Sequence, residues 1–193
     1  MAPTKGSITR ERIVDTALAR ASLEGLEALS IGELAQAVGM SKSGLFAHFG
    51  SKESLQLAVL DAMLTRFGDT VWRPVKVLAR GKARLQALLP RWLDWLDGEV
   101  LPGGCPIQAA VVEFDDRPGP LRDALAASQR RWIDTIAREV TNERPAADGQ
   151  QFAFELNGLV MAYTAARKLM GDPRARVRAE TAFAGLMDRF GLL

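Results

Sequence analysis

Several residue types that support particular chemistries are scarce in this chain of 193 residues. A single cysteine, Cys105, excludes an internal disulfide bond, and a single histidine, His48, excludes a multi-histidine metal centre within one chain. No apolar run approaches the roughly 20 residues that a membrane-spanning helix needs. Residues 1–7 also lack the apolar stretch of a signal peptide. We therefore expect a cytoplasmic protein without a metal or another cofactor.

Neither sign of charge dominates, because 25 Lys and Arg residues stand against 23 Asp and Glu residues and leave a formal net charge of +2. This balance excludes a surface that is positive throughout, so any contact with nucleic acid must come from a small, defined site. The hydrophobic fraction of 48% is sufficient for a folded core without disulfides or metals.

Strand signals are nearly absent as well, with one tyrosine and no sustained alternation of apolar and polar residues. Helical periodicity extends over most of the chain and predicts an all-α fold of about nine helices. The first three are expected over about 10–24, 31–38 and 42–49, with Thr9, Ser30 and Ser41 as their N-caps. Ser51 is expected to cap the fourth, which reaches about residue 72 before Pro74 bends or ends it. The remaining helices are expected over about 85–96, 109–114, 121–140, 152–170 and 177–190.

The second and third predicted helices are joined by a tight turn at Gly39. Two short helices joined in this way form a helix-turn-helix, in which the second helix enters the major groove of DNA. A generic helical hairpin satisfies part of the same pattern. The motifs LSIGELA at 29–35, VGMSKSGLF at 38–46, HF at 48–49 and SKE at 51–53 go further, because together they closely resemble the TetR family of repressors.

The resemblance covers residues 9 to about 60. It implies a three-helix helix-turn-helix DNA-binding domain over residues 1–51 and a larger helical domain for effector binding and dimerisation over residues 52–193. It also implies a homodimer that binds double-stranded DNA at a palindromic operator.

Candidate DNA contacts follow from the resemblance and from the chemistry of a helix N-terminus, where exposed backbone amides attract phosphate. Gly44 lets the third helix come close to the groove, and Lys52 is placed to hold a backbone phosphate. Phe46 stands where the family usually has a tyrosine, so it lacks the hydroxyl that donates to phosphate and packing remains an alternative role. His48 matches the family's histidine, although a half-buried histidine bonded to a backbone carbonyl explains it equally well. The full set is Thr9, Ser30, Ser41, Lys42, Ser43, Gly44, Phe46, His48 and Lys52.

The larger domain is expected to bind an effector and a second copy of the chain. Aromatic and methionine side chains line adaptable apolar cavities, although each of these residues also suits ordinary core packing. The effector candidates are Trp92, Trp95, Glu113, Phe114, Met161 and Tyr163. Residues 152–163 are apolar nearly all around a helix, and the last helix carries one apolar stripe, which together suit a four-helix dimer seam. The predicted dimer contacts are Phe152, Leu156, Leu159, Tyr163, Phe183, Leu186, Met187 and Phe190.

The sequence therefore predicts a ligand-responsive repressor that a small apolar or amphipathic effector releases from DNA. A helical interaction module that keeps the helix-turn-helix for packing only is an alternative, and a transcriptional activator is another. An enzyme is not expected, because the lone histidine lies in the DNA-reading motif and no phosphate-binding glycine loop is present. The segment 103–106 resembles a loop of one branch of the family, and burial of Cys105 is favoured over a redox role.

Overall fold

The computed structural model describes residues 5–98, 101, 103 and 105–193, and every regular element in these ranges is helical. The all-α prediction is confirmed. Three helical segments, α4 (Lys52–Phe67), the π-helix η1 (Gly68–Trp72) and α5 (Arg73–Lys76), follow one another without a break. Pro74 lies at the start of α5, directly after the π-helix η1, and the helical run continues past it to Lys76. Counting continuous runs gives nine helices among the described residues.

Contacts between Cα atoms divide the chain into two units. One contains residues 1–67 and 98–126, and the other contains residues 68–97 and 127–193. Helix α8 (Pro120–Glu143) contributes its first turns to the first unit and the rest to the second. The functional boundary expected at residue 51 remains a prediction. Residues 1–4, which belong to the segment without a signal-peptide pattern, lie outside the described residues, as do residues 102 and 104.

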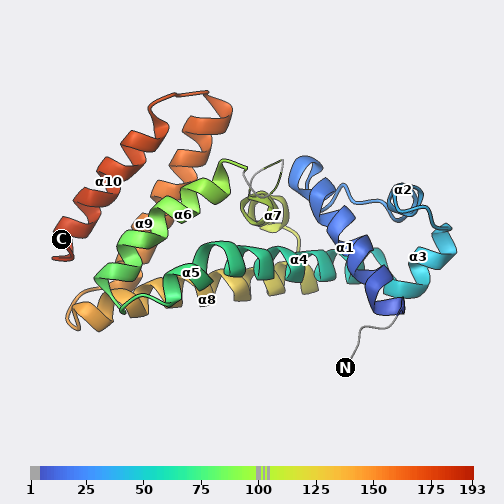
Figure 1. Ribbon diagram of the computed structural model, residues 1–193, viewed down its shortest axis with the longest axis horizontal. Helices are drawn as coiled ribbons and strands as arrows, with labels where there is room; N and C mark the ends of the chain where they lie inside the picture. Colours follow the sequence, from blue (N-terminus) through green and yellow to red (C-terminus); the bar gives the residue numbers. More distant parts are fainter. Residues whose placement is uncertain (1–4, 99–100, 102, 104) are drawn as a thin grey trace. The chain divides into compact units, whose positions relative to one another are not determined.

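The first unit is built on α1 (Lys5–Glu24), which packs against α2 (Ile31–Ala37), α4 and α7 (Pro106–Phe114). Figure 1 shows α2 and α3 (Lys42–Phe49) beside α1. The inner faces of these helices are apolar and fully covered. Buried residues in this core include Ile13, Ala17, Val38, Leu45 and Phe49.

The turns of this unit follow short-range sequence signals. Gly25 and Gly39 have φ angles of +91° and +70°, which only glycine adopts without strain, and they follow α1 and α2. Ser30 accepts a hydrogen bond from the backbone of Glu33, as predicted for a cap. The prediction for Thr9 is wrong, because α1 already begins at Lys5 and Thr9 lies inside the helix.

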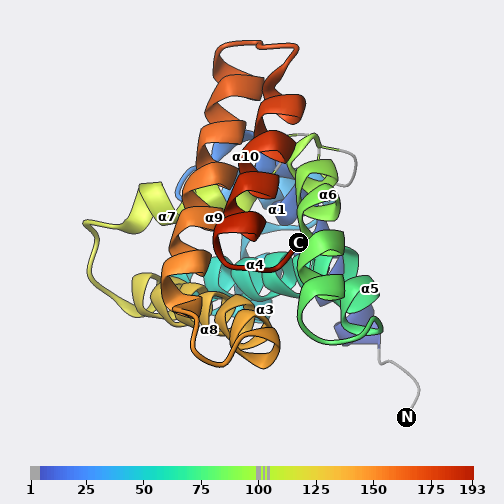
Figure 2. The ribbon, with the colours of Figure 1, turned by 90° about the vertical axis from the view of Figure 1, so that its left-hand side faces the viewer.

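The second unit contains α6 (Lys82–Leu96), most of α8, α9 (Gly149–Thr164), the π-helix η2 (Ala165–Leu169) and α10 (Ala175–Arg189). Helices α9 and α10 lie side by side, as Figure 2 shows. Between them, the ring of Phe152 meets those of Phe183 and Phe190 edge-on, with centroids 6.4 and 5.2 Å apart. Trp132 makes similar edge-on contacts with Trp72 and Trp92. Aromatic contacts of this kind stabilise the core of the unit.

A buried carboxylate fixes the start of α6. Glu139 on α8 accepts hydrogen bonds from the backbone of Gly81, at 2.8 Å, and from the guanidinium of Arg84, at 2.9 Å. Buried charge is tolerated here because both carboxylate oxygens are paired. Among the described residues, no helix is both long enough and apolar enough to cross a membrane.

Candidate nucleic-acid interface

The N-terminal turn of α3 presents polar side chains to the surface. Ser41 is the N-cap, and its hydroxyl accepts a 3.0 Å hydrogen bond from the backbone of Gly44, so this cap is confirmed. Ser41, Lys42 and Ser43 are exposed, and the hydroxyls of the two serines lie 3.2 Å apart. Exposed hydroxyl and ammonium donors at a helix N-terminus are suited to phosphate and base-edge contacts.

Gly44 serves the geometry of this turn. A Cβ atom at this position would lie 3.1 Å from the hydroxyl oxygen of Ser41, closer than ordinary side-chain contacts. A larger residue would therefore disturb the cap of α3. Because Gly44 has no side chain, the outer surface of α3 does not protrude at this position.

The aromatic residues of α3 divide between surface and core. Phe46 keeps 49% of its surface exposed, so its ring does not serve only as core packing. His48 is half-buried, and its ring centroid lies 6.4 Å from that of buried Phe49. The guanidinium of Arg10 on α1 lies over the ring of Phe49, 5.0 Å from its centroid. Phe46 is thus the exposed phenylalanine of α3, whereas Phe49 lies in the core.

Lys52, at the start of α4, is engaged within the chain. Its ammonium donates to the backbone oxygen of Glu27 at 2.5 Å and to a carboxylate oxygen of Glu27 at 3.2 Å. Gln56 donates to the same carboxylate at 3.1 Å. Burial raises the pKa of Glu27, but these hydrogen bonds and the charges of Lys52 and Arg117 outweigh it and lower the pKa below its ordinary value. Local sequence patterns do not indicate this cluster, because Glu27 lies 25 or more residues from each of its partners.

Two further residues hold the helix-turn-helix in place and were not among the predicted site residues. Arg12 on α1 donates to the backbone oxygen of Val38 at 3.0 Å, which satisfies a carbonyl at the end of α2. Ser51 accepts from the backbone of Ser54 at 3.0 Å, which confirms its predicted role as the cap of α4. An arginine 26 residues before its acceptor leaves no local sequence signal.

Glu113 was expected as a polar contact for an effector, but in the structure its carboxylate is bonded to the chain itself. It accepts hydrogen bonds from the backbone of Leu26, at 2.9 Å, and of Glu27, at 3.0 Å. Both oxygens are therefore committed to the loop between α1 and α2. This side chain lies in the first unit, in the same group of contacts as the helix-turn-helix.

The other effector candidates are spread over both units. Trp92, Trp95 and Tyr163 are buried in the second unit, and Phe114 is buried in the first. Met161 keeps 57% of its surface exposed on the outer face of α9, and its role as an effector contact stays a prediction. Helical periodicity could not show this, since α9 is apolar on nearly every side.

The hydroxyl of Tyr163 donates a 2.6 Å hydrogen bond to a carboxylate oxygen of Asp97, at the end of α6. Burial, this hydrogen bond and the negative charge of Asp97 raise the pKa of Tyr163 to about 12. Arg176 donates to the other oxygen of Asp97 at 3.4 Å. The hydroxyl of Tyr163 thus faces the ion pair of Asp97 and Arg176 rather than an apolar cavity.

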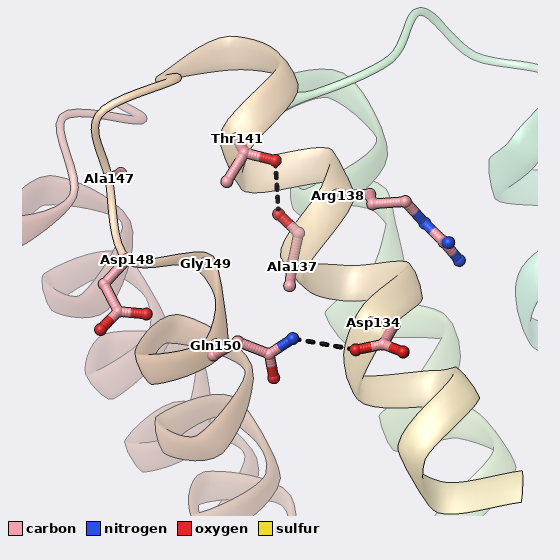
Figure 3. Close-up of a pocket in the computed structure, with 8 residues that line it drawn as sticks. All are labelled: Asp134, Ala137, Arg138, Thr141, Ala147, Asp148, Gly149 and Gln150. Carbon is pink, nitrogen blue, oxygen red and sulfur yellow. Dashed lines mark hydrogen bonds between the residues drawn. The ribbon is translucent and has the colours of Figure 1, made fainter. Parts of the chain in front are cut away.

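A pocket of about 320 Å³ opens between α8 and the N-terminus of α9. Figure 3 shows two hydrogen bonds among its lining residues: Gln150 donates to Asp134 at 2.9 Å, and Thr141 donates to the backbone oxygen of Ala137 at 3.2 Å. None of the predicted effector residues line it. In the described part of the chain, no group of three or more His, Cys, Asp or Glu side chains is arranged to hold a metal ion.

The predicted dimer contacts require a correction. Six of them are buried within their own unit, so their side chains fill the core of one chain and cannot form an exposed seam. The six are Phe152, Leu156, Tyr163, Phe183, Leu186 and Met187. Leu159 and Phe190 are partly covered. The opposite face of α9 carries the exposed apolar residues, with Phe154 exposed over 73% of its surface.

Comparison with known proteins agrees with this architecture. Residues 13–59 match the family model described as bacterial regulatory proteins, tetR family, and residues 81–183, more than half of the chain, match the model described as Tetracyclin repressor-like, C-terminal domain. The HTH-type transcriptional regulator BetI of Rhizobium meliloti (strain 1021) is 30% identical over 146 residues, which cover 76% of this chain and 71% of BetI. The nucleoid occlusion factor SlmA of Vibrio vulnificus (strain YJ016) is 32% identical over 162 residues, which cover 80% of this chain and 78% of SlmA.

Solved structures share the fold. A TetR-family transcriptional regulator from Cytophaga hutchinsonii superposes with a TM-score of 0.83 at 22% identity, covering 99% of this chain and 97% of that one. AibR in complex with isovaleryl coenzyme A and operator DNA gives a TM-score of 0.72 at 22% identity, covering 91% and 96%. A regulator from Saccharomonospora viridis in complex with choline gives 0.73 at 22% identity, covering 94% and 95%.

An all-helical chain with an exposed helix-turn-helix near its N-terminus defines a DNA-binding transcriptional regulator. The chain belongs to the TetR family.

Proposed function

We propose that this regulator is a repressor that binds a palindromic operator as a homodimer and is released by a small apolar or amphipathic effector. The observation that carries the DNA-binding part is the exposed N-terminal turn of α3, where Ser41, Lys42 and Ser43 surround a capped helix end. Such a turn supplies amide, hydroxyl and ammonium donors to one strand of DNA. A symmetric dimer would present two such turns to two half-sites.

The exposed face of α9 and α10 supports the homodimer. Phe154, Gly158 and Met161 are exposed at i, i+4 and i+7, which places them along one side of α9. A Cβ atom at Gly158 of α9 or at Gly185 of α10 would meet nothing within 4 Å. No other side chain therefore covers either glycine. A second copy can bring its own two helices against it and form a four-helix seam.

The effector is proposed to bind the second unit. AibR and the Saccharomonospora viridis regulator, which share this fold, were crystallised with isovaleryl coenzyme A and choline. All four tryptophans of this chain lie in the second unit, so tryptophan emission reports on that unit alone. Titration with choline and with isovaleryl coenzyme A is expected to change the emission for the ligand class that binds. A change in emission without release of DNA would contradict the effector role.

Selection of bound duplexes from a random DNA library tests the proposal directly. We expect a palindromic sequence with half-sites about one helical turn apart or a multiple of it. Lys42→Ala is expected to weaken binding and to reduce the slope of log K against log salt by about one, since one phosphate contact is lost. Lys76→Ala makes the same change of charge at an exposed position of α5 and serves as the matched control.

Failure of the wild-type chain to retain any duplex at low salt would overturn the proposal and favour the interaction module instead. Phe46, which lacks a phosphate donor, and Lys52, which is bound to Glu27, are the observations that favour this second candidate. An activator would bind the same duplexes, and a reporter gene placed behind the selected operator distinguishes it from a repressor.

A further inference from the structure

Glu113 connects α7 to the loop that leads into the helix-turn-helix. Its Oε2 accepts from the backbone N–H of Leu26 at 2.9 Å, and its Oε1 accepts from the backbone N–H of Glu27 at 3.0 Å. Two hydrogen bonds to one carboxylate fix both the position and the orientation of the loop, since bonds to a charged acceptor are strong and directional. The three residues belong to one unit, so this contact is defined within it.

The loop is shaped to fit the carboxylate. Gly25 precedes the two donors and has a φ angle of +91°. A Cβ atom at Gly25 would lie 2.7 Å from Oε1 of Glu113, so the backbone passes directly against the side chain. Glycine meets both requirements, the left-handed backbone and the close approach.

A second set of contacts ties the same loop to α4. Gln56, a buried side chain, donates to the backbone oxygen of Leu26 at 3.1 Å and to the carboxylate of Glu27. Lys52 donates to the backbone oxygen of Glu27. From the end of α7, Arg117 approaches the Glu27 carboxylate to 3.9 Å. The loop is therefore held between α4 on one side and α7 on the other.

The positions of the two family matches give this contact its significance. Leu26 and Glu27 lie within the N-terminal match, residues 13–59, together with α2 and α3. Glu113 lies within the C-terminal match, residues 81–183. The Glu113 hydrogen bonds thus link the DNA-reading domain of the family to its effector domain.

We propose that Glu113 is a positioning residue for DNA binding, which holds the α1–α2 loop so that α2 and α3 keep the orientation that reads DNA. A displacement of α7 reaches the reading helices through these two hydrogen bonds. The inference rests on the function proposed above.

The test is Glu113→Gln in the full chain, measured with the duplex recovered by selection. The amide keeps the size of the side chain, but its NH2 group cannot accept, so at least one backbone N–H loses its partner. We expect the affinity to fall about tenfold or more, because the loop loses at least one hydrogen bond to a charged acceptor and no longer fixes α2 and α3 in the orientation that binds DNA. Removal of a negative charge by itself favours DNA binding, so a loss of affinity cannot be an effect of the lost charge.

Asp116→Asn is the matched control, because it removes the same charge three residues further on, at an exposed position. It is expected to bind DNA at least as well as the wild type. Amide hydrogen exchange, followed by NMR, supplies a readout that a general loss of stability does not imitate. Glu113→Gln is expected to speed exchange at Leu26 and Glu27 about tenfold, while buried amides in α1 keep their wild-type rates.

If Glu113→Gln does not fold, a variant with a shorter carboxylate side chain still tests the inference. Glu113→Asp retains the charge and withdraws it by one bond, about 1.5 Å, so an affinity between those of the wild type and the amide variant is expected. Equal affinities of Glu113→Gln and Asp116→Asn, with a wild-type chain that binds, would overturn the inference and leave the proposed function standing. A wild-type chain that binds no duplex would overturn the proposed function, and the inference with it.

Discussion

The ammonium group of Lys52 lies 2.5 Å from the backbone oxygen of Glu27 and 3.2 Å from one oxygen of its carboxylate. A lysine at the start of α4 thus bonds both the main chain and the side chain of the loop that precedes α2. The resemblance to the family assigns the same lysine to a DNA phosphate. Both partners of the ion pair are partly exposed, so an incoming phosphate can compete with the carboxylate for the ammonium group.

Glu27→Gln is expected to steepen the salt dependence of DNA binding. The amide removes the competing charge and leaves Lys52 available to a phosphate, so the slope of log K against log salt should steepen by up to about one. Binding of the selected duplex at several salt concentrations measures the slope. Glu24→Gln, which removes a neighbouring charge paired with Arg20, is the control and should leave the slope unchanged. An unchanged slope in Glu27→Gln as well would show that Lys52 does not reach a phosphate.

The lowered pKa of Glu27 predicts a contribution to acid stability. A carboxyl whose pKa is lower in the folded state stabilises the fold above its unfolded pKa, about 4.3, and loses this contribution as the pH falls through the folded value. The difference in thermal midpoint between the wild type and Glu27→Gln should therefore be constant near pH 7 and shrink below about pH 4. A difference that grows on acidification would contradict the prediction.

Elements that depend on a few neighbouring residues could be predicted from the sequence. Ser30, Ser41 and Ser51 each bond a backbone N–H three residues further on, so the cap and its acceptor are visible together in the sequence. The helical period likewise predicted the helices of the second unit to within a few residues. The prediction that Thr9 is the N-cap of the first helix failed, because α1 begins at Lys5, four residues before Thr9.

Contacts between distant segments could not be predicted in the same way. The bonds from Glu113 to Leu26 and Glu27 cross 86 or more residues, and a carboxylate on an amphipathic helix carries no signal of its partner. The prediction of which face of α9 is exposed failed for another reason. Phe152 and Phe154 are both apolar, and the period of the helix does not show which of them faces the core of its own chain. Burial of Phe152 and exposure of Phe154 settle that question within one chain.

Tyr163 is the only tyrosine in the chain, so its ionisation can be followed by ultraviolet absorbance without interference from another tyrosine. Its pKa of about 12 predicts a phenol that stays protonated in the folded state well above the ordinary value of about 10. The stabilisation is present below pH 10 and is lost as the pH rises toward 12. Asp97→Asn removes the charge that faces the phenol and should lower the midpoint. A midpoint near 10 in the folded wild-type chain would contradict the hydrogen bond to Asp97.

Phe152→Ala is expected to lower the free energy of unfolding by about 3–5 kcal/mol, since the ring is fully buried against Phe183 and Phe190 and its removal leaves a cavity. Urea unfolding followed by tryptophan emission measures the change in the unit that contains all four tryptophans. Leu169→Ala, at an exposed apolar position of the same unit, should change stability by less than about 0.5 kcal/mol. Equal effects of the two substitutions would show that Phe152 does not lie in the core.

Phe154→Glu is expected to convert a dimer into a monomer without unfolding either chain. The residue is 73% exposed on the outer face of α9, so a carboxylate there is solvated in the single chain but becomes buried, next to its symmetry mate, in a four-helix seam. Sedimentation equilibrium at several concentrations measures the mass. Val77→Glu places the same charge at an apolar residue that is 81% exposed and lies outside α9 and α10, and this variant should remain dimeric. A wild-type chain that sediments as a monomer, or a Phe154→Glu variant that keeps the dimer mass, would show that the second copy does not bind through this face.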